Sequence, residues 1–191
     1  MYQPASFRSG DPDVYRTVID AHPFAALVTV VDGVPFASHV PFLFDRDAIV
    51  GHLARANPQW RQFAGDALVV FNGPHAYVSP RWYASQPQVP TWNYVAVHVY
   101  GTPEIVDAGP IVRRLSARFD PDWMMDEGFV DSLLGAIVGV RVPLTRVEAK
   151  LKLSQNRDGA DAEGARAGLS GGGEEERAVA AWMGRWMGDG R

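Results

Sequence analysis

The stretch ALVTVVDGVPFASHV, residues 26–40, is the strongest structural signal in this chain. Residues 26–31 are apolar or β-branched, Asp32-Gly33 is typical of a type I′ turn, and residues 34–40 form a returning strand. Pro35 and Pro41 remove backbone N–H donors, which a sheet tolerates at an edge strand or a bulge. The stretch therefore predicts a β-hairpin whose second strand lies at a sheet edge or carries a bulge.

Further strands are predicted C-terminal to the hairpin. Residues 48–53 hold an apolar run, and residues 67–71 are nearly all apolar, as in a central strand buried on both faces. In residues 92–101, WNYVAVHVYG, valines alternate with other side chains. The last strands are predicted at 137–142 and 146–151. Six to seven short, mainly antiparallel strands indicate a small closed or partly closed barrel.

Helical patterns surround these strands and complete an α+β fold. Asp11-Pro12 is typical of a helix N-terminus, so a helix is predicted over about 11–21. Two apolar stripes predict helices between 111 and 137. Residues 158–173 are rich in glycine and alanine, and we predict a flexible linker there. Residues 174–191 predict an amphipathic helix that docks on the body of the protein, residues 1–157, or on a partner subunit.

Composition narrows the chemistry that is available to the chain. Its 191 residues suit one domain, and 47% of them are hydrophobic. The absence of cysteine excludes disulfides, thiolate metal sites and a cysteine nucleophile. Redox chemistry would therefore require a bound cofactor. The net charge of -4 is scattered along the chain and gives no support to nucleic-acid binding.

The sequence lacks the motifs that mark several functional classes. The first residues have no signal-peptide pattern, and no apolar run approaches the ~18–20 residues that span a bilayer, so we predict a cytoplasmic protein. GxSxG, P-loop and GxGxxG motifs are absent. The five histidines do not have the spacing of a zinc protease, and we predict no metal site.

Three blocks combine aromatic and polar side chains. In the first, His52, Arg55 and Asn57 stand where a strand runs into a short proline-initiated helix, a place that suits a phosphate group. The alternative is an ordinary Asn cap with a surface arginine. The second block offers ring-stacking surface or, equally, a core or subunit interface; its members are His75, Tyr77, Trp82, Tyr83, Trp92 and Tyr94.

The third block follows the last predicted strand directly. It holds Lys152, Ser154, Gln155, Asn156 and Arg157. These side chains suit an anion or a ring edge, although a solvated strand end is the more frequent role of such a run.

Together these blocks resemble the PaiB family, FMN-binding negative transcriptional regulators of bacteria. The matching stretches run in the same order over about 1–157: MYQPASF, HPFAALVT, ASHVPF, GHLARANPQW, GPHAYVSPRWY, VPTWNYVAVHVYG and KLSQNR. The resemblance implies an FMN-binding split β-barrel, similar to pyridoxamine-phosphate oxidases. It also implies a homodimer with cofactor sites between the subunits.

The resemblance also assigns expected roles to individual residues. Arg55 is the expected phosphate ligand, but Ala54 and Ala56 flank it where the oxidases show a Ser-Arg-Lys run, so one cationic contact is absent. Lys152 or Arg157, from the same or the partner subunit, is the expected replacement. The expected contacts to the flavin ring are Ser38, His39, Trp92 and Asn93. The remaining candidates for cofactor binding are His52, Asn57, His75 and Gln155.

Three functions remain open from the sequence. The first is an FMN-binding regulator or flavin sensor, whose direct contact with DNA has no support from charge or motif. The second is a flavin-dependent oxidoreductase acting on a small substrate, with His75 or Tyr83 as acid or base. The third is a dimeric binding protein that has lost the flavin and holds haem or another flat ligand.

Overall fold

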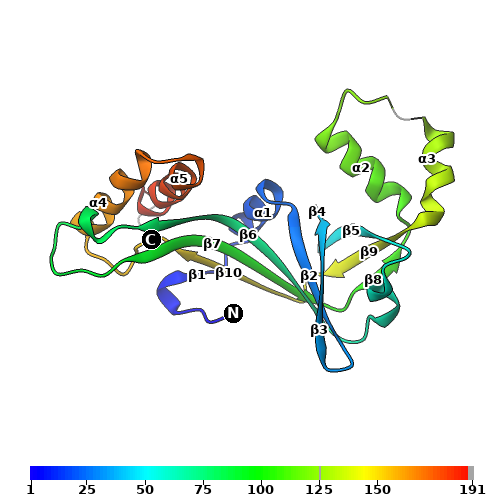
Figure 1. Ribbon diagram of the computed structural model, residues 1–191, viewed down its shortest axis with the longest axis horizontal. Helices are drawn as coiled ribbons and strands as arrows, with labels where there is room; N and C mark the ends of the chain where they lie inside the picture. The colour runs from blue at the N-terminus through cyan, green and yellow to red at the C-terminus, as the bar shows by residue number, and fades with distance from the viewer. Residues whose placement is uncertain (125, 189–191) are drawn as a thin grey trace. The chain divides into compact units, whose positions relative to one another are not determined.

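The computed structural model describes residues 1–124 and 126–188 (Figure 1). Within these residues the chain forms α-helices, β-strands and short 3-10 helices in the following order. They are η1 Ala5–Phe7, β1 Arg8–Ser9, α1 Pro12–Ala21, β2 Phe24–Val31, β3 Val34–Pro41, β4 Leu43–Asp45, β5 Ala48–Ala54, η2 Pro58–Gln62, β6 Ala67–Val78, η3 Pro80–Trp82, β7 Thr91–Gly101, β8 Glu104–Val106, α2 Gly109–Phe119, α3 Glu127–Leu133, η4 Leu134–Ala136, β9 Ile137–Pro143, β10 Arg146–Lys152, α4 Gly159–Ser170 and α5 Glu174–Gly188. None of the helices in this part of the chain is long and apolar enough to cross a membrane.

The strands form a six-stranded sheet, in the order β1-β10-β7-β6-β2-β3, and a four-stranded sheet, in the order β4-β5-β9-β8. Pairing is antiparallel between β2 and β3, between β2 and β6, and between β5 and β9. The expected α+β class with mainly antiparallel strands and peripheral helices is confirmed. The strands outnumber the six to seven predicted, because β1, β4 and β8 have only two or three residues, too few for a periodicity.

The predicted hairpin is confirmed in detail. Asp32 and Gly33 have φ angles of 52° and 79°, the positive values that a type I′ turn requires at both central positions. The register pairs Val31 with Val34 and Leu27 with Ser38. As Pro35 and Pro41 predicted, β3 is an edge strand of its sheet.

The chain divides into two compact units, and β6, β7 and β10 contribute residues to both. Unit 1 comprises residues 1–14, 72–97 and 148–191, and unit 2 comprises residues 15–71 and 98–147.

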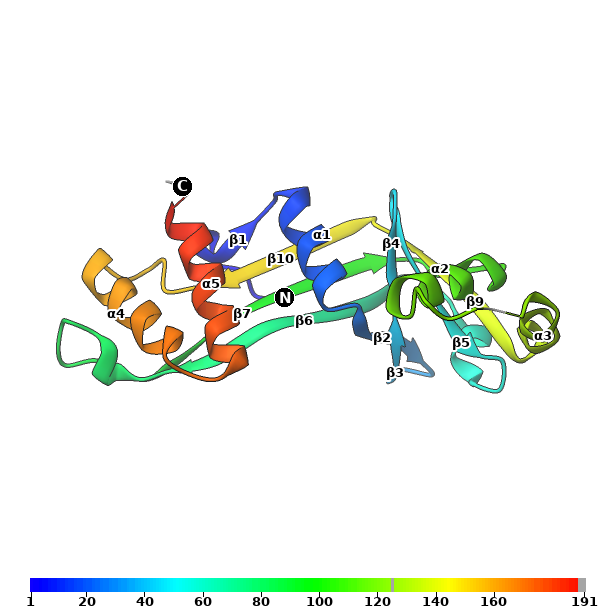
Figure 2. The same ribbon diagram turned by 90° about the horizontal axis from the view of Figure 1, so that it is seen from above.

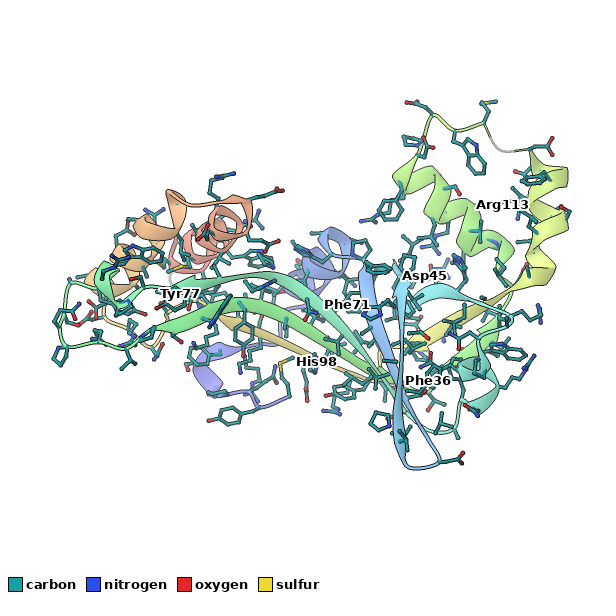
Figure 3. The ribbon with its side chains drawn as sticks, in the orientation of Figure 1. Phe36, Asp45, Phe71, Tyr77, His98 and Arg113 are labelled. Carbon is teal, nitrogen blue, oxygen red and sulfur yellow. The ribbon has the colours of Figure 1, made fainter. Side chains whose placement is uncertain are left out.

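Unit 2 has its core between the strands and α2. Phe42 and Phe71 are fully buried, with ring centroids 6.2 Å apart. Ile111 and Leu115 of α2 pack against Leu43 and Val50. Arg113 lies between α2 and α3 (Figure 3) and bonds to Glu127 at 2.8 Å and to Asp131 at 2.7 Å. The two helices are thus joined by a charged contact on the surface.

Unit 1 carries α4 and α5 on its strands β6, β7 and β10 (Figure 2). Val179 and Met183 of α5 are fully buried, as the predicted amphipathic stripe requires. The helix is described to Gly188; the last three residues of the segment 174–191, in which a helix was expected, lie outside the described residues.

The prediction of a flexible linker at 158–173 is wrong for most of its length, because residues 159–170 form α4. Asp158 caps this helix by accepting a bond from the N–H of Asp161. A Cβ at Gly164 would lie 2.0 Å from the carbonyl oxygen of Trp82, and one at Gly168 would lie 2.3 Å from its indole. These glycines therefore permit close packing of α4 on η3, a role that composition does not distinguish from flexibility.

Candidate functional site

Arg55 follows the last residue of β5 in unit 2 and holds the turn before β9. Its Nε donates to the carbonyl of Gly135 at 2.5 Å, and its Nη2 donates to that of Ile137 at 2.9 Å. Its backbone N–H donates to Ala136 at 2.8 Å. The side chain is exposed, and within the described part of the chain it has no carboxylate partner and no bond at Nη1. One edge of the guanidinium thus remains open to a ligand.

Asn57 connects this turn to the β2–β3 hairpin. Its side-chain oxygen accepts from the N–H of Gln59 at 3.0 Å, which caps η2, and its Nδ2 donates to Ser38 Oγ at 2.8 Å. Ser38 and Asn57, both expected at the cofactor site, are therefore in contact. Whether they touch a cofactor stays a prediction.

Gln59 is a structural residue of this region that the sequence analysis missed. It is fully buried, and its Nε2 lies 3.1 Å from three acceptors that share its two N–H groups, the Leu27 carbonyl, Thr29 Oγ1 and the Phe36 carbonyl. Its Oε1 has no partner among the described residues. Gln59 thus fastens η2 to both strands of the hairpin.

Trp60 and Arg61 were also missed as candidates. The indole Nε1 of Trp60 donates to the Arg55 carbonyl at 3.0 Å. The guanidinium carbon of Arg61 lies 4.8 Å from the centroid of the Trp60 ring, and that of Arg55 lies 6.0 Å from it. Two exposed arginines therefore share one indole as a cation–π partner.

A cavity of about 160 Å³ lies next to this indole, lined by Arg55, Trp60 and residues of β8, β9 and η4. Its lining includes the carboxylate residue Asp107, whose Oδ1 accepts from the N–H of Gly109 at 3.0 Å. The cavity is too small for a flavin ring, which needs a site of several hundred Å³. It can admit a compact anionic group or ordered water.

Two of the three histidines expected at the cofactor site, His39 and His52, lie in unit 2 and differ in burial. His52 is half-buried on β5; burial lowers its pKa, so its imidazole is neutral near pH 7, and its Nδ1 has no partner among the described residues. His39 is exposed on β3 and stacks on Phe24 at 5.9 Å. In the described part of the chain, neither histidine forms a hydrogen bond with Arg55 or Asn57. The structure therefore does not join them to that group.

Unit 1 gathers a second set of the expected residues on its exposed sheet face. Trp92 stacks on His75 at 6.2 Å and meets Tyr77 edge-on at 6.2 Å. Trp92 is 53% exposed and Tyr77 46%, and an open groove of about 440 Å³ runs beside His75, Trp92 and Tyr94. Tyr77 is labelled in Figure 3. This face offers exposed aromatic surface, which suits either a stacked ring or a subunit interface, the two alternatives that the sequence left open.

Asn93 does not share this face with Trp92, although both were expected in one ring pocket. Neighbouring residues of a strand point to opposite sides of the sheet. Asn93 is fully buried, donates to Ser154 Oγ at 2.9 Å and approaches Met183 Sδ at 3.5 Å. Its amide thus joins β7, the turn after β10, and α5.

The polar block after β10 bonds mainly to its own surroundings. Lys152 Nζ donates to the Trp92 carbonyl at 2.6 Å and to Thr91 Oγ1. Burial, followed by the positive charges of Lys150 and Arg157, lowers the pKa of Lys152. The side chain of Gln155 folds back on the backbone of Leu153 and Leu151.

Arg157 is engaged in the same manner. It donates to Gln88 Oε1 at 2.5 Å and lies 4.7 Å from the centroid of the Tyr83 ring. Asp161, another residue that the sequence analysis missed, accepts from the N–H of Ser85 at 2.8 Å. Arg157 and Asp161 thus hold the loop that precedes β7.

Five of the eleven residues expected at the cofactor site therefore fall into two groups. In unit 2, Asn57 bonds to Ser38, and Arg55, two positions before Asn57, accepts a bond from Trp60, on whose ring Arg61 lies. His75 and Trp92 form a group in unit 1.

Comparison with known proteins identifies the fold and the family. Residues 1–146 match a family model described as "Putative FMN-binding domain". The chain is 36% identical to "Protease synthase and sporulation protein PAI 2" of Bacillus subtilis over 84% of this chain and 85% of that protein. FMN, the cofactor expected from the sequence, is the one in the family's description.

Solved structures share the fold at lower identity. The flavocytochrome Anf3 from Azotobacter vinelandii aligns with a TM-score of 0.62 at 15% identity, over 76% of this chain and 69% of that chain. The FAD and heme binding protein from Mycobacterium smegmatis aligns with a TM-score of 0.62 at 22% identity, over 76% of this chain and 73% of that chain. With the fold and the family model in agreement, the chain belongs to the PaiB family of FMN-binding split-barrel proteins.

Proposed function

We propose that this protein is an FMN-binding transcriptional regulator or flavin sensor that acts as a homodimer. The observation that carries the proposal is the group around Arg55 in a chain that belongs to an FMN-binding family. Arg55 is exposed and lacks a carboxylate partner in the described part of the chain, and its backbone is fixed by bonds to η4 and to Trp60. Such a preorganised guanidinium suits a phosphate.

The residues present fit FMN in kind. A phosphate ester calls for cationic forks, and unit 2 presents Arg55 and Arg61 beside one indole. A flavin ring also calls for a few placed polar groups, which Ser38 and Asn57 of unit 2 can provide. When bound, the flavin would supply reversible two-electron chemistry, while these side chains bind and orient it.

The exposed sheet face of unit 1 supports the homodimer. Trp92, Tyr77 and His75 leave large ring surfaces in solvent, whereas helices cover the opposite face of these strands. Subunit interfaces are enriched in aromatic residues at their centres, and a second copy of the chain would remove this surface from water. In that arrangement residues of the partner subunit would contribute to the cofactor site.

The charge distribution favours a regulator that does not read DNA through a basic helix. The most basic helix, α2, carries three arginines, and each is neutralised: Arg113 by Glu127 and Asp131, Arg114 by Asp45, and Arg118 by Asp20. The name of the relative PAI 2 refers to protease synthesis and sporulation. We propose that regulation proceeds through a response to flavin and through protein contacts.

A flavin titration tests this proposal. We expect FMN, added to the purified protein, to show a shifted visible spectrum and altered fluorescence, and sedimentation to give a mass of about twice the 20.9 kDa chain. Absence of any spectral change at about tens of micromolar FMN would contradict flavin binding. A single-chain mass at the same concentration would contradict the homodimer. Oxidation of NADPH by the flavin-loaded protein would favour the oxidoreductase instead.

A further inference from the structure

Two arginines, Arg55 and Arg61, lie near the ring of Trp60. Arg61 belongs to η2, and its role is still unassigned. It is exposed, it lies 4.8 Å from the Trp60 ring centroid, and the described residues include no carboxylate within salt-bridge distance of it. An arginine that stacks on an indole keeps its N–H groups at the ring edges, where they can bind a ligand. Arg61 is therefore held in place without using its donors.

Arg55 alone does not balance the charge of a phosphate. Its Nε and Nη2 already donate to the carbonyls of Gly135 and Ile137. The two Nη1 N–H groups and the second Nη2 N–H are not engaged by the described residues, so Arg55 can still offer a phosphate one pair of parallel bonds, but it brings only one positive charge. A phosphate with close to two negative charges at this point needs a second cation.

Trp60 connects the two arginines. Its Nε1 donates to the Arg55 carbonyl at 3.0 Å, which fixes the indole to the turn that carries Arg55, and both guanidinium groups lie near its ring. The neighbouring cavity is also lined by Asp107, whose Oδ1 accepts the N–H of Gly109 and which forms no ion pair with either arginine among the described residues. The result is a local positive site on a chain whose net charge is -4.

We infer that Arg61 is the second cationic ligand of the flavin phosphate and makes the protein prefer FMN to riboflavin. This inference rests on the proposed function. Arg61 would supply the cationic contact that the segment around Arg55 lacks. It belongs to the same unit as Arg55, whereas Lys152 and Arg157 belong to unit 1 and donate to neighbouring groups of the chain. Trp60 acts as a positioning residue for both arginines.

The test compares two flavins that differ only in the phosphate. Wild type, Arg61→Gln and Arg61→Lys are titrated with FMN and with riboflavin, and binding is followed by flavin fluorescence. We expect wild type to prefer FMN by about 100-fold, because two charged hydrogen-bonding groups contact the phosphate. Arg61→Gln should lose about tenfold in FMN affinity and keep its riboflavin affinity. Arg61→Lys should recover part of the loss because it keeps the charge.

Arg185→Gln is the matched control. Arg185 also stacks on a tryptophan, Trp182, at 5.4 Å, but it belongs to α5 of unit 1. It should retain the full preference for FMN, which separates a local contact from a general loss of charge.

The outcomes separate this inference from the proposed function. If wild type binds neither flavin, the proposed function is overturned and this inference with it. If wild type prefers FMN and Arg61→Gln keeps the whole preference, only the role of Arg61 is overturned. A loss of riboflavin affinity equal to the loss of FMN affinity would also overturn it, since the arginine would then act on the ring or on the fold.

Discussion

Arg61 in unit 2 and Lys152 in unit 1 are both cationic residues that contact a tryptophan, and the contacts differ in kind. Arg61 lies against the ring of Trp60 and keeps its donors. Lys152 directs its ammonium at the backbone carbonyl of Trp92 and at the Thr91 hydroxyl, and burial lowers its pKa. A cation held through a ring face remains available to a ligand, whereas one that donates to neighbouring groups of its own chain serves the fold.

The largest effect is expected at Arg55. Its side chain donates to backbone carbonyls, as that of Lys152 does, and also lies near the Trp60 ring, as that of Arg61 does. Arg55→Ala should weaken FMN binding by about 1.5–3 kcal/mol, the range for hydrogen bonds to charged groups. Fluorescence titration measures this loss, and thermal unfolding of the same variant measures any loss of stability. Arg55→Lys serves as the control for charge. A loss of stability with no change in FMN affinity would place Arg55 with Lys152 and break the comparison.

Asn93 should affect stability and not flavin binding. Asn93→Ala removes a buried amide and leaves Ser154 Oγ without that donor, so the free energy of unfolding should fall by about 2 kcal/mol. Denaturant unfolding measures the loss, and FMN affinity of the folded variant should stay unchanged. Specific loss of FMN binding in Asn93→Ala would show that the buried amide is part of the site.

Lys152→Met should also lower the stability of the protein, by less than Asn93→Ala. Methionine retains much of the apolar stem, but the Trp92 carbonyl and the Thr91 hydroxyl lose the ammonium donor. We expect the free energy of unfolding to fall by about 1 kcal/mol. FMN affinity should change by less than about twofold. A tenfold loss of affinity would instead make Lys152 the phosphate ligand and remove the need for Arg61.

The pH dependence of stability gives the smallest effect. The pKa of Lys152 in the folded protein is below its ordinary value of 10.5, so between these two values the unfolded chain binds more protons than the folded chain. The free energy of unfolding of wild type should therefore rise with pH in this window, relative to that of Lys152→Met. Denaturant unfolding at several pH values measures the difference. A constant difference would contradict the lowered pKa.

Local signals explain which parts of the fold the sequence predicts. The hairpin follows from Asp32-Gly33, because two consecutive residues with positive φ specify one turn type. The helix α4 was missed because a glycine that allows close packing and a glycine that adds flexibility look alike in composition. Only the position of Trp82 against Gly164 and Gly168 distinguishes them.

In the candidate site, too, some features could be predicted from the sequence and others could not. The alternation of residues 92–101 predicts Val95, Val97 and Val99 on one face, and its extension places Asn93 with the valines and Trp92 opposite, as the structure has them. That signal was present in the sequence. The roles of Gln59 and Arg61 were not, because Gln59 bonds to residues about thirty positions away and Arg61 depends on the orientation of an indole.

The glycines of α4 also determine how that helix is acquired. Three of its twelve residues are glycine, which gives the segment a low intrinsic tendency to be helical. Its helical state therefore depends on the surface that Trp82 provides, and the two segments should become ordered in one cooperative step. The indole of Trp82 packs against Gly168, so its emission should report that step as the chain folds.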